Sequence, residues 1–216
     1  MTWKTASLLV ICVVLLAVPV YGESQESKII GQRSFNISYN VDENLAGLSS
    51  VEVWVTTDGG RTYSLWGRDE DCTPPVLFEA PSDGVYGFVI VSTDKAGNRE
   101  QPPAAGTAPE AVAVVDTAPP AVRIDSPTGG QVYAPGSNVE VRWEASDANL
   151  GDKCVDVLVS SDDGNSWSAV HQGIANSGSA VLPLPGAAAQ KYLVKVVVRD
   201  LAANVGQALT RIPVVV

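Results

Sequence analysis

Histidine and cysteine are scarce in this chain, and their scarcity limits the chemistry that the protein can perform. Of 216 residues, His171 is the only histidine, and three are cysteines. A nucleophilic triad requires a histidine base, and a zinc site requires several imidazole or thiolate ligands. The Gly59-Gly60 pair belongs to a predicted hairpin turn rather than to a phosphate-binding loop. We therefore predict that the protein is not an enzyme and has no catalytic or cofactor-binding residues.

Charged residues are absent from the stretch between Lys4 and Glu23. The apolar run from residue 8 to residue 20 is shorter than the roughly 20 residues of a comfortable bilayer span, and small or modest side chains stand at Val20 and Gly22. This pattern predicts a signal peptide over residues 1–22, cleaved after Gly22, with an uncleaved N-terminal anchor as the alternative. The mature chain is then secreted, periplasmic or displayed at the cell surface, without a membrane span.

Removal of the signal peptide also removes Cys12, which leaves Cys72 and Cys154, one in each half of the chain. Such a distribution does not suit a disulfide-stapled secreted domain. We expect two unpaired thiols, with a bridge between them as the alternative. Each half must then fold on its hydrophobic core. Each half has about 95 residues, which is close to the size of an immunoglobulin-like sandwich, about 100 residues, and is therefore long enough.

Basic residues are outnumbered by acidic residues, 14 to 24, and the chain carries a formal net charge of −10. Such a surface repels phosphate backbones and anionic lipid, so nucleic acid is excluded as a partner. The same surface tolerates neutral glycans or bound cations.

The sequence contains two copies of one unit. Apolar and polar residues alternate in every matched block, which is typical of half-buried strands, and no stretch has helical periodicity. We predict an all-β fold of two tandem immunoglobulin-like (fibronectin type III-like) β-sandwich domains, over residues 23–117 and 118–216. The matched blocks are residues 35–39 with 139–143, 51–55 with 155–159, 56–63 with 160–167, 86–91 with 192–197, and 94–98 with 200–204.

The boundary between the two units carries Pro119 and Pro120, which favour a short, extended joint. Domain 2 has its own opening segment from residue 122 to residue 133. The counterpart in domain 1 falls inside the predicted signal peptide, so only the stretch around Ile29 can serve as its first strand. One sheet edge of domain 1 is therefore expected to be short or open.

The second hairpin, residues 160–167, resembles the Asp-box pattern Ser-x-Asp-x-Gly-x-Thr-Trp, with Ser166 in the place of the threonine; residues 56–63 are a looser copy. This resemblance implies a structural motif, in which Asp58 and Asp162 bond turn amides and Tyr63 and Trp167 plug the hairpins. Asp-boxes also occur in sialidases, but a sialidase would need more such hairpins, an arginine cluster and a tyrosine nucleophile. The chain has two such hairpins and neither of the other features, so we do not expect a sialidase.

Residues 83–88, followed by residues 94–98, resemble the penultimate strand and exit turn of bacterial immunoglobulin-like and fibronectin type III repeats of exported proteins. The opening of domain 2, at residues 126–130, also resembles an immunoglobulin-like domain of fungal cell-wall proteins. The resemblance implies tyrosine corners at two tyrosines and structural roles for four residues in the two exit turns. Phe88 and Val194 replace the cysteine of immunoglobulins, so the intersheet disulfide is absent. The implied structural residues are Tyr86, Tyr192, Asp94, Asn98, Asp200 and Asn204.

Two ligand classes remain open. Strand phase places Trp54 outward, where it either joins Trp66 in a glycan-contacting patch or is covered by the loop from residue 67 to residue 80. Calcium could use three oxygen-rich loops, although none has the spacing of an EF-hand and such residues are common in turns. These loops contain Asp69, Glu70 and Asp71; Asp147, Asn149 and Asp152; and Asp42, Glu43 and Asn44.

These observations favour a non-catalytic exported structural, spacer or adhesion module that acts through protein contacts. The alternative is a carbohydrate-binding appendage. The partner, a protein or a glycan at the cell surface, is not specified by the sequence.

Overall fold

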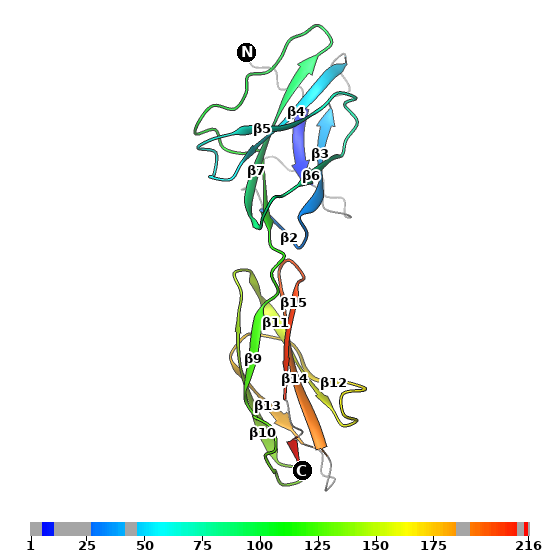
Figure 1. Cartoon of the computed structure of the whole chain (residues 1–216), viewed down its shortest axis with the longest axis vertical. Helices are drawn as coiled ribbons and strands as arrows, with labels where there is room; N and C mark the ends of the chain where they lie inside the picture. The colour runs from blue at the N-terminus through cyan, green and yellow to red at the C-terminus, as the bar shows by residue number, and fades with distance from the viewer. Residues whose placement is uncertain (1–5, 11–26, 42–46, 185–190, 211–213, 216) are drawn as a thin grey trace. The chain divides into compact units, whose positions relative to one another are not determined.

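The structure is a computed structural model that describes residues 6–10, 27–41, 47–184, 191–210 and 214–215. In these residues the regular structure consists of β-strands, with no helix (Figure 1), and hence no helix that could cross a membrane. The chain divides into two compact units, Met1–Thr117 and Ala118–Val216, which are called domain 1 and domain 2 below. The predicted all-β fold of tandem sandwiches is confirmed.

Domain 1 consists of a three-stranded sheet, in the order β1-β3-β6, and a five-stranded sheet, in the order β2-β8-β7-β4-β5. The two sheets share one core, in which Phe35 and Phe78 of the smaller sheet meet Phe88 of the larger one. The strands are β1 (Ala6–Val10), β2 (Lys28–Ile30), β3 (Ser34–Val41), β4 (Leu48–Thr56), β5 (Ser64–Asp69), β6 (Val76–Glu79), β7 (Gly84–Asp94) and β8 (Ala111–Val115).

Domain 2 repeats this plan with the sheets β13-β10-β9 and β12-β11-β14-β15, the latter extended by β16 beside β14. Its core joins Val141 and Trp143 of the first sheet to Val157 and Val196 of the second. The strands are β9 (Ala121–Ser126), β10 (Asn138–Ser146), β11 (Leu150–Ser160), β12 (Ser168–Ile174), β13 (Ser179–Pro183), β14 (Lys191–Asp200), β15 (Val205–Leu209) and β16 (Val214–Val215).

The alternation seen in the sequence sets the two faces of the strands. In β4, Val51, Val53 and Val55 are buried in the core, while Trp54 lies on the outer face and is half-buried. This arrangement follows from the period of two, because successive side chains point to opposite faces of a sheet.

The first strand lies within the predicted signal peptide. β1 pairs antiparallel with β3, so that Leu8 stands opposite Tyr39 and Val10 opposite Ile37. The remainder of residues 1–22 lies outside the described residues, and the signal peptide stays a prediction. The predicted strand around Ile29 is β2, which pairs parallel with β8. The edge that was expected to be open in domain 1 is therefore the edge that β1 occupies.

The outer face of the larger sheet of domain 1 is not open to solvent throughout. Val89 and Val91 alternate with the core residues Phe88 and Ile90, yet both are buried. The segment between β7 and β8 turns back toward this face, where the Gly106 amide donates to the Gly60 carbonyl oxygen at 2.8 Å. The larger sheet thus buries side chains on both of its faces.

Candidate functional site

The Asp-box hairpin of domain 2 is organised by one carboxylate. Asp162 accepts hydrogen bonds from the Ser166 amide at 2.8 Å and from the Ser166 hydroxyl at 2.6 Å. The Ser160 hydroxyl donates to Asp162 at 2.7 Å and accepts from the Gly164 amide. The Trp167 indole N–H donates to the Gly164 carbonyl oxygen at 3.1 Å. The carboxylate and the indole both close the turn.

The looser copy in domain 1 forms the same network. Asp58 accepts from the amide and the hydroxyl of Thr62, at 2.9 and 2.7 Å, and from the Thr56 hydroxyl at 2.8 Å. The Tyr63 hydroxyl donates to the Thr107 carbonyl oxygen at 3.0 Å and so ties the hairpin to the segment before β8. In both hairpins the aspartate thus accepts hydrogen bonds from backbone and side-chain groups of its own turn.

These hydrogen bonds stabilise the ionised carboxylates. The Thr62 hydroxyl and amide lower the pKa of Asp58 from 3.8 to about 2, and those of Ser166 lower the pKa of Asp162 to about 2. A carboxylate whose oxygens accept several turn hydrogen bonds is poorly placed to act as a general base near neutral pH.

The turns after the penultimate strands use a second repeated network. Asp94 accepts from the Asn98 amide at 2.8 Å and from its side-chain amide at 2.7 Å. Asp200 binds Asn204 in the same way, at 2.8 Å for both bonds. In each turn the aspartate is thus bonded to the asparagine four residues later.

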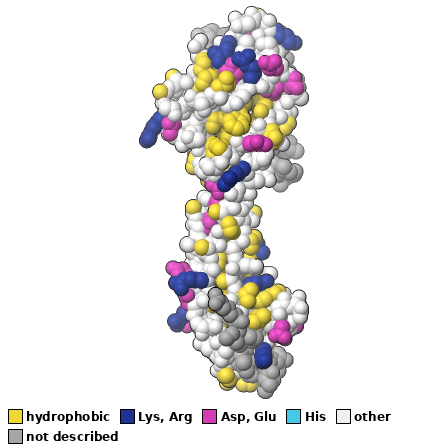
Figure 2. Space-filling model, viewed as in Figure 1, with side chains coloured by type: hydrophobic (Ala, Val, Ile, Leu, Met, Phe, Trp, Pro, Cys, Tyr) yellow, Lys and Arg dark blue, Asp and Glu magenta, His cyan; other side chains and the backbone are white. Residues whose placement is uncertain are grey.

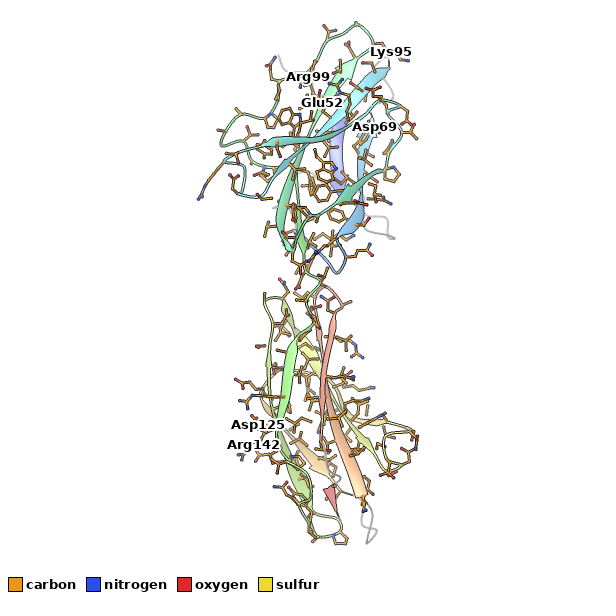
Figure 3. All side chains as sticks on the ribbon, in the orientation of Figure 1. Glu52, Asp69, Lys95, Arg99, Asp125 and Arg142 are labelled. Carbon is orange, nitrogen blue, oxygen red and sulfur yellow. The ribbon has the colours of Figure 1, made fainter. Side chains whose placement is uncertain are left out.

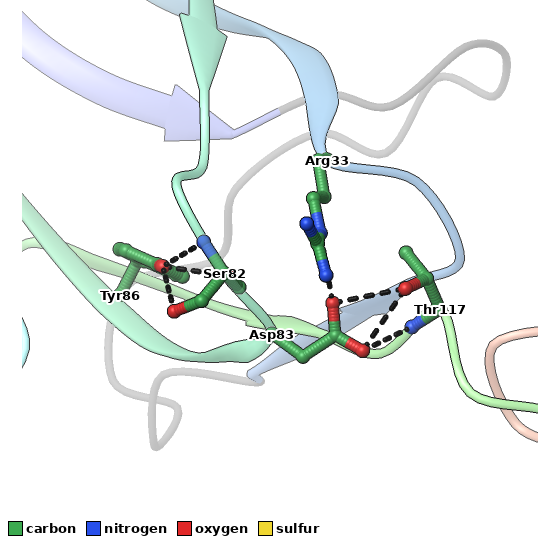
Figure 4. Close-up of polar contacts among 5 residues, drawn as sticks. All are labelled: Arg33, Ser82, Asp83, Tyr86 and Thr117. Atoms are coloured by element: carbon green, nitrogen blue, oxygen red, sulfur yellow. Dashed lines mark hydrogen bonds and ion pairs between the residues drawn. The ribbon is translucent and has the colours of Figure 1, made fainter.

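The tyrosine corner of domain 1 is present at Tyr86. This side chain is 3% exposed, and its hydroxyl donates to the Ser82 carbonyl oxygen at 2.7 Å (Figure 4). Tyr192 of domain 2 is buried at the corresponding position, where it packs in the core. Both tyrosines serve the fold.

Next to this corner, Asp83 joins two distant segments of domain 1. It accepts from the Thr117 amide at 2.9 Å and from the Thr117 hydroxyl at 3.0 Å, and Arg33 donates to it at 3.1 Å (Figure 4). The Thr117 amide is the leading cause of a lowered pKa of Asp83. The last residue of domain 1 is therefore held to the turn before β7. The sequence analysis did not single out this cluster, because its members are 34 and 50 residues apart.

The predicted aromatic patch is not formed. Trp54 lies on the outer face of the larger sheet, whereas Trp66 packs on the core residue Phe78 with ring centroids 4.6 Å apart. A β-bulge between β4 and β5 places Leu65, not Trp66, opposite Trp54. The segment expected to cover Trp54 instead crosses to the other sheet, where β6 pairs with β3. Trp66 remains 43% exposed, so it is the better placed of the two for contact with a glycan.

The outer face holds a buried carboxylate that the sequence analysis did not identify. Glu52 is 1% exposed and accepts from Arg68 and Arg99, both at 2.6 Å, and from the Trp54 indole at 3.0 Å. Figure 3 labels Glu52 and Arg99, which lie next to each other in domain 1. Arg99, then Arg68 and Trp54, lower the pKa of Glu52 from 4.5 to about 2 against the opposing effect of burial. The carboxylate is ionised at neutral pH and compensated within domain 1.

Among the loops considered for calcium, most described carboxylates already bind the protein. Asp69 accepts from the Tyr39 hydroxyl at 2.5 Å, and Asp71 accepts from the Thr73 amide. In domain 2, one carboxylate oxygen of Asp147 and one of Asp200 lie within 4.8 Å of each other, while Asp152 is exposed on β11. The loop with Asp42, Glu43 and Asn44 lies outside the described residues, and calcium binding stays a prediction.

The cysteines and the histidine form no reactive group in the described structure. Cys72 and Cys154 are free thiols, one in each domain, and burial raises the pKa of both. His171 interacts through Nε2 with the Val181 carbonyl oxygen at 2.8 Å. Neither thiol has the lowered pKa of a nucleophilic cysteine.

The visible surface is mixed in character. Acidic and basic side chains lie side by side, with hydrophobic side chains between them (Figure 2). Exposed ion pairs such as Arg142 with Glu140 account for part of this pattern.

No protein-family model matches the chain, and no curated protein matches it. Among solved structures, the fibronectin(III)-like modules of Clostridium thermocellum CbhA are 20% identical over 89% of this chain and 90% of that chain, with a TM-score of 0.49. Domains from titin are 14% identical over 95% and 66%, with a TM-score of 0.46. The FN1-FN3 domains of chicken CNTN1 are 14% identical over 88% and 64%, with a TM-score of 0.33. The sheet topology above, rather than these distant likenesses, establishes the fold.

Proposed function

We propose that the chain is a non-catalytic exported structural module that works as a spacer or adhesion element through protein contacts. The observation that carries this proposal is the way in which the two ends of domain 1 are held. β2, which follows the predicted signal peptide, runs parallel to β8, the last strand of the domain, with Ile29 opposite Val114. The Asp116 amide extends this pairing by donating to the Ile30 carbonyl oxygen at 2.9 Å.

This parallel pair suits a module under tension. Force that enters domain 1 at the start of β2 and leaves at the end of β8 pulls the two strands in opposite directions along their length. Because this force acts along the strands and across the hydrogen bonds that join them, it loads those bonds together instead of breaking them one by one. Asp83 adds two further bonds at Thr117, the residue through which the force would leave.

The absence of a catalytic role is supported by how the singled-out carboxylates are used. Asp58, Asp94, Asp162 and Asp200 bond to turn amides or hydroxyls, and Glu52 is compensated by two arginines. A catalytic acid and base must instead reach a substrate within one cleft.

The test is single-molecule force spectroscopy on the chain, held by handles before Lys28 and after Val216. Two unfolding events are expected, each releasing roughly 300 Å of chain at about 3.5 Å per residue. Asp83→Ala should lower the unfolding force of domain 1 and leave that of domain 2 unchanged. Glu140→Ala, which removes an exposed ion pair of domain 2, is the matched control. An unchanged force in Asp83→Ala would contradict the proposed load path.

A carbohydrate-binding appendage is the second candidate, and the exposed ring of Trp66 favours it. An aromatic face that is open to solvent can stack on a sugar ring, while Trp54 is half-buried and hydrogen-bonded to Glu52. Under this alternative, Trp66→Ala should abolish binding to a polysaccharide, and Trp54→Ala should weaken it less.

A further inference from the structure

The central strand of the smaller sheet in domain 1 uses its two edges for different partners. Residues 34–37 of β3 pair with β6 on one edge, and residues 37–41 pair with β1 on the other. Cleavage after Gly22 would remove β1. Ser38, Tyr39 and Asn40 would then have no partner strand on either edge among the strands described for domain 1.

Domain 2 shows what belongs at this position. β10 is the counterpart of β3, and its second half pairs with β9, which the same domain supplies. Ile124 stands opposite Trp143 and Val122 opposite Ala145, and both β9 side chains pack on the domain 2 core. The position therefore takes an antiparallel strand with apolar side chains at every second residue.

The part of domain 1 that remains after cleavage does not match this requirement. Residues 23–27 read Glu-Ser-Gln-Glu-Ser and include no apolar side chain. The next segment, β2, is held by β8 in the other sheet. Without β1, the backbone groups at the free edge of β3 and the core around Ile37 and Tyr39, now 0% and 2% exposed, would face solvent.

We propose that mature domain 1 accepts a β-strand from another polypeptide along this edge of β3. The strand runs antiparallel to β3 and carries apolar residues opposite Ile37 and Tyr39, as β1 does with Val10 and Leu8. Main-chain hydrogen bonds supply the affinity, and the alternating apolar positions supply the specificity. This inference rests on the proposed function, because it gives the chemistry of the protein contact through which the module acts.

The experiment starts with protein secreted from the full gene, whose N-terminus is determined by intact mass. A labelled synthetic peptide of residues 4–10 is then titrated into it, and binding is followed by fluorescence anisotropy. We expect saturable binding, together with slower amide exchange at residues 38–41 of β3 and unchanged exchange in β10 of domain 2. If mature domain 1 is unfolded on its own, the peptide should restore its near-ultraviolet circular dichroism.

Two variant peptides test the register. Leu8→Asp places a charge opposite the buried Tyr39 and should weaken binding at least tenfold. Leu9→Asp places the same charge opposite Ser38, which is half-buried, and should weaken it much less. Equal weakening by the two peptides would overturn the proposed register.

Other results would overturn the proposal itself. An intact N-terminus at Met1 would mean that β1 fills the edge within its own chain. A mature N-terminus at Glu23 without peptide binding would mean that the edge does not accept a strand. Either result leaves the force measurement on Asp83→Ala unaffected, so failure of this inference is distinguishable from failure of the spacer proposal.

Discussion

Replacement of Glu52 by glutamine should destabilise domain 1 more than any exposed charge substitution does. Glu52 is 1% exposed, while Arg68 and Arg99 are 48% and 39% exposed. The variant keeps the size of the side chain and removes its charge, so the two guanidinium groups lose their common partner. A lowering of the pKa from 4.5 to about 2 corresponds to about 3 kcal/mol of stability at neutral pH.

Solvent screening at the half-exposed arginines reduces this figure to about 2 kcal/mol. A loss of this size should lower the melting temperature of a domain of about 100 residues by roughly 10 °C. Because the pKa is lower in the folded state, the contribution is complete above about pH 5 and is lost as the pH falls toward 2. The stability difference between wild type and Glu52→Gln should therefore shrink over that interval.

The assay is urea unfolding at several pH values, monitored by tryptophan fluorescence. Trp54 reports on the site because its indole N–H donates a hydrogen bond to Glu52. Asp156→Asn is the matched control, because Asp156 occupies the same repeat position in domain 2 but is less buried, with 19% of its side chain exposed, and pairs with a single arginine, Arg199, which is 54% exposed. The control should cost less than about 1 kcal/mol. Equal losses in the two variants, or a Glu52→Gln difference that does not change between pH 7 and pH 2, would refute the reasoning.

Three further substitutions test the internal networks. Asp162→Asn should lower the melting temperature of domain 2 at pH 7 but not at pH 2, because the folded-state pKa of about 2 makes the contribution disappear on acidification. Tyr86→Phe removes one buried hydrogen bond and should cost about 1 kcal/mol in urea unfolding. Gly206→Ala should destabilise domain 2 by about 2 kcal/mol or more, since a Cβ there would lie 1.9 Å from the Pro120 carbonyl oxygen, whereas Gly67→Ala in open space should be tolerated.

The strands and hairpins could be predicted because their signals are local and occur twice. Alternation in β4 placed Val51 and Val53 inward, and the repeat fixed the matching strand in domain 2. The hydrogen bonds of Asp58 and Asp162 also join residues within four positions of each other. Such features depend on strand period and turn chemistry, which a single sequence carries.

The remaining features depend on contacts between distant segments. Phase alone placed Glu52 on an outer face, but its burial depends on Arg99, which is 47 residues away. The sequence could not show that Trp54 and Trp66 lie on different faces of the sheet. A bulge shifts the register of β5 by one residue, and a one-residue shift moves a side chain to the other face. The pairing of β1 with β3 could not be anticipated from a stretch that has the composition of a signal peptide.

The central claim, that the module acts through protein contacts and not by binding a sugar, is tested most directly by a retention assay. Mature protein is incubated with a panel of insoluble polysaccharides, with Trp66→Ala and Trp54→Ala alongside, and the bound fraction is measured after sedimentation. We predict that the wild type stays in the supernatant with every polymer. Retention of the wild type that is lost in Trp66→Ala would contradict the claim and establish the carbohydrate-binding alternative.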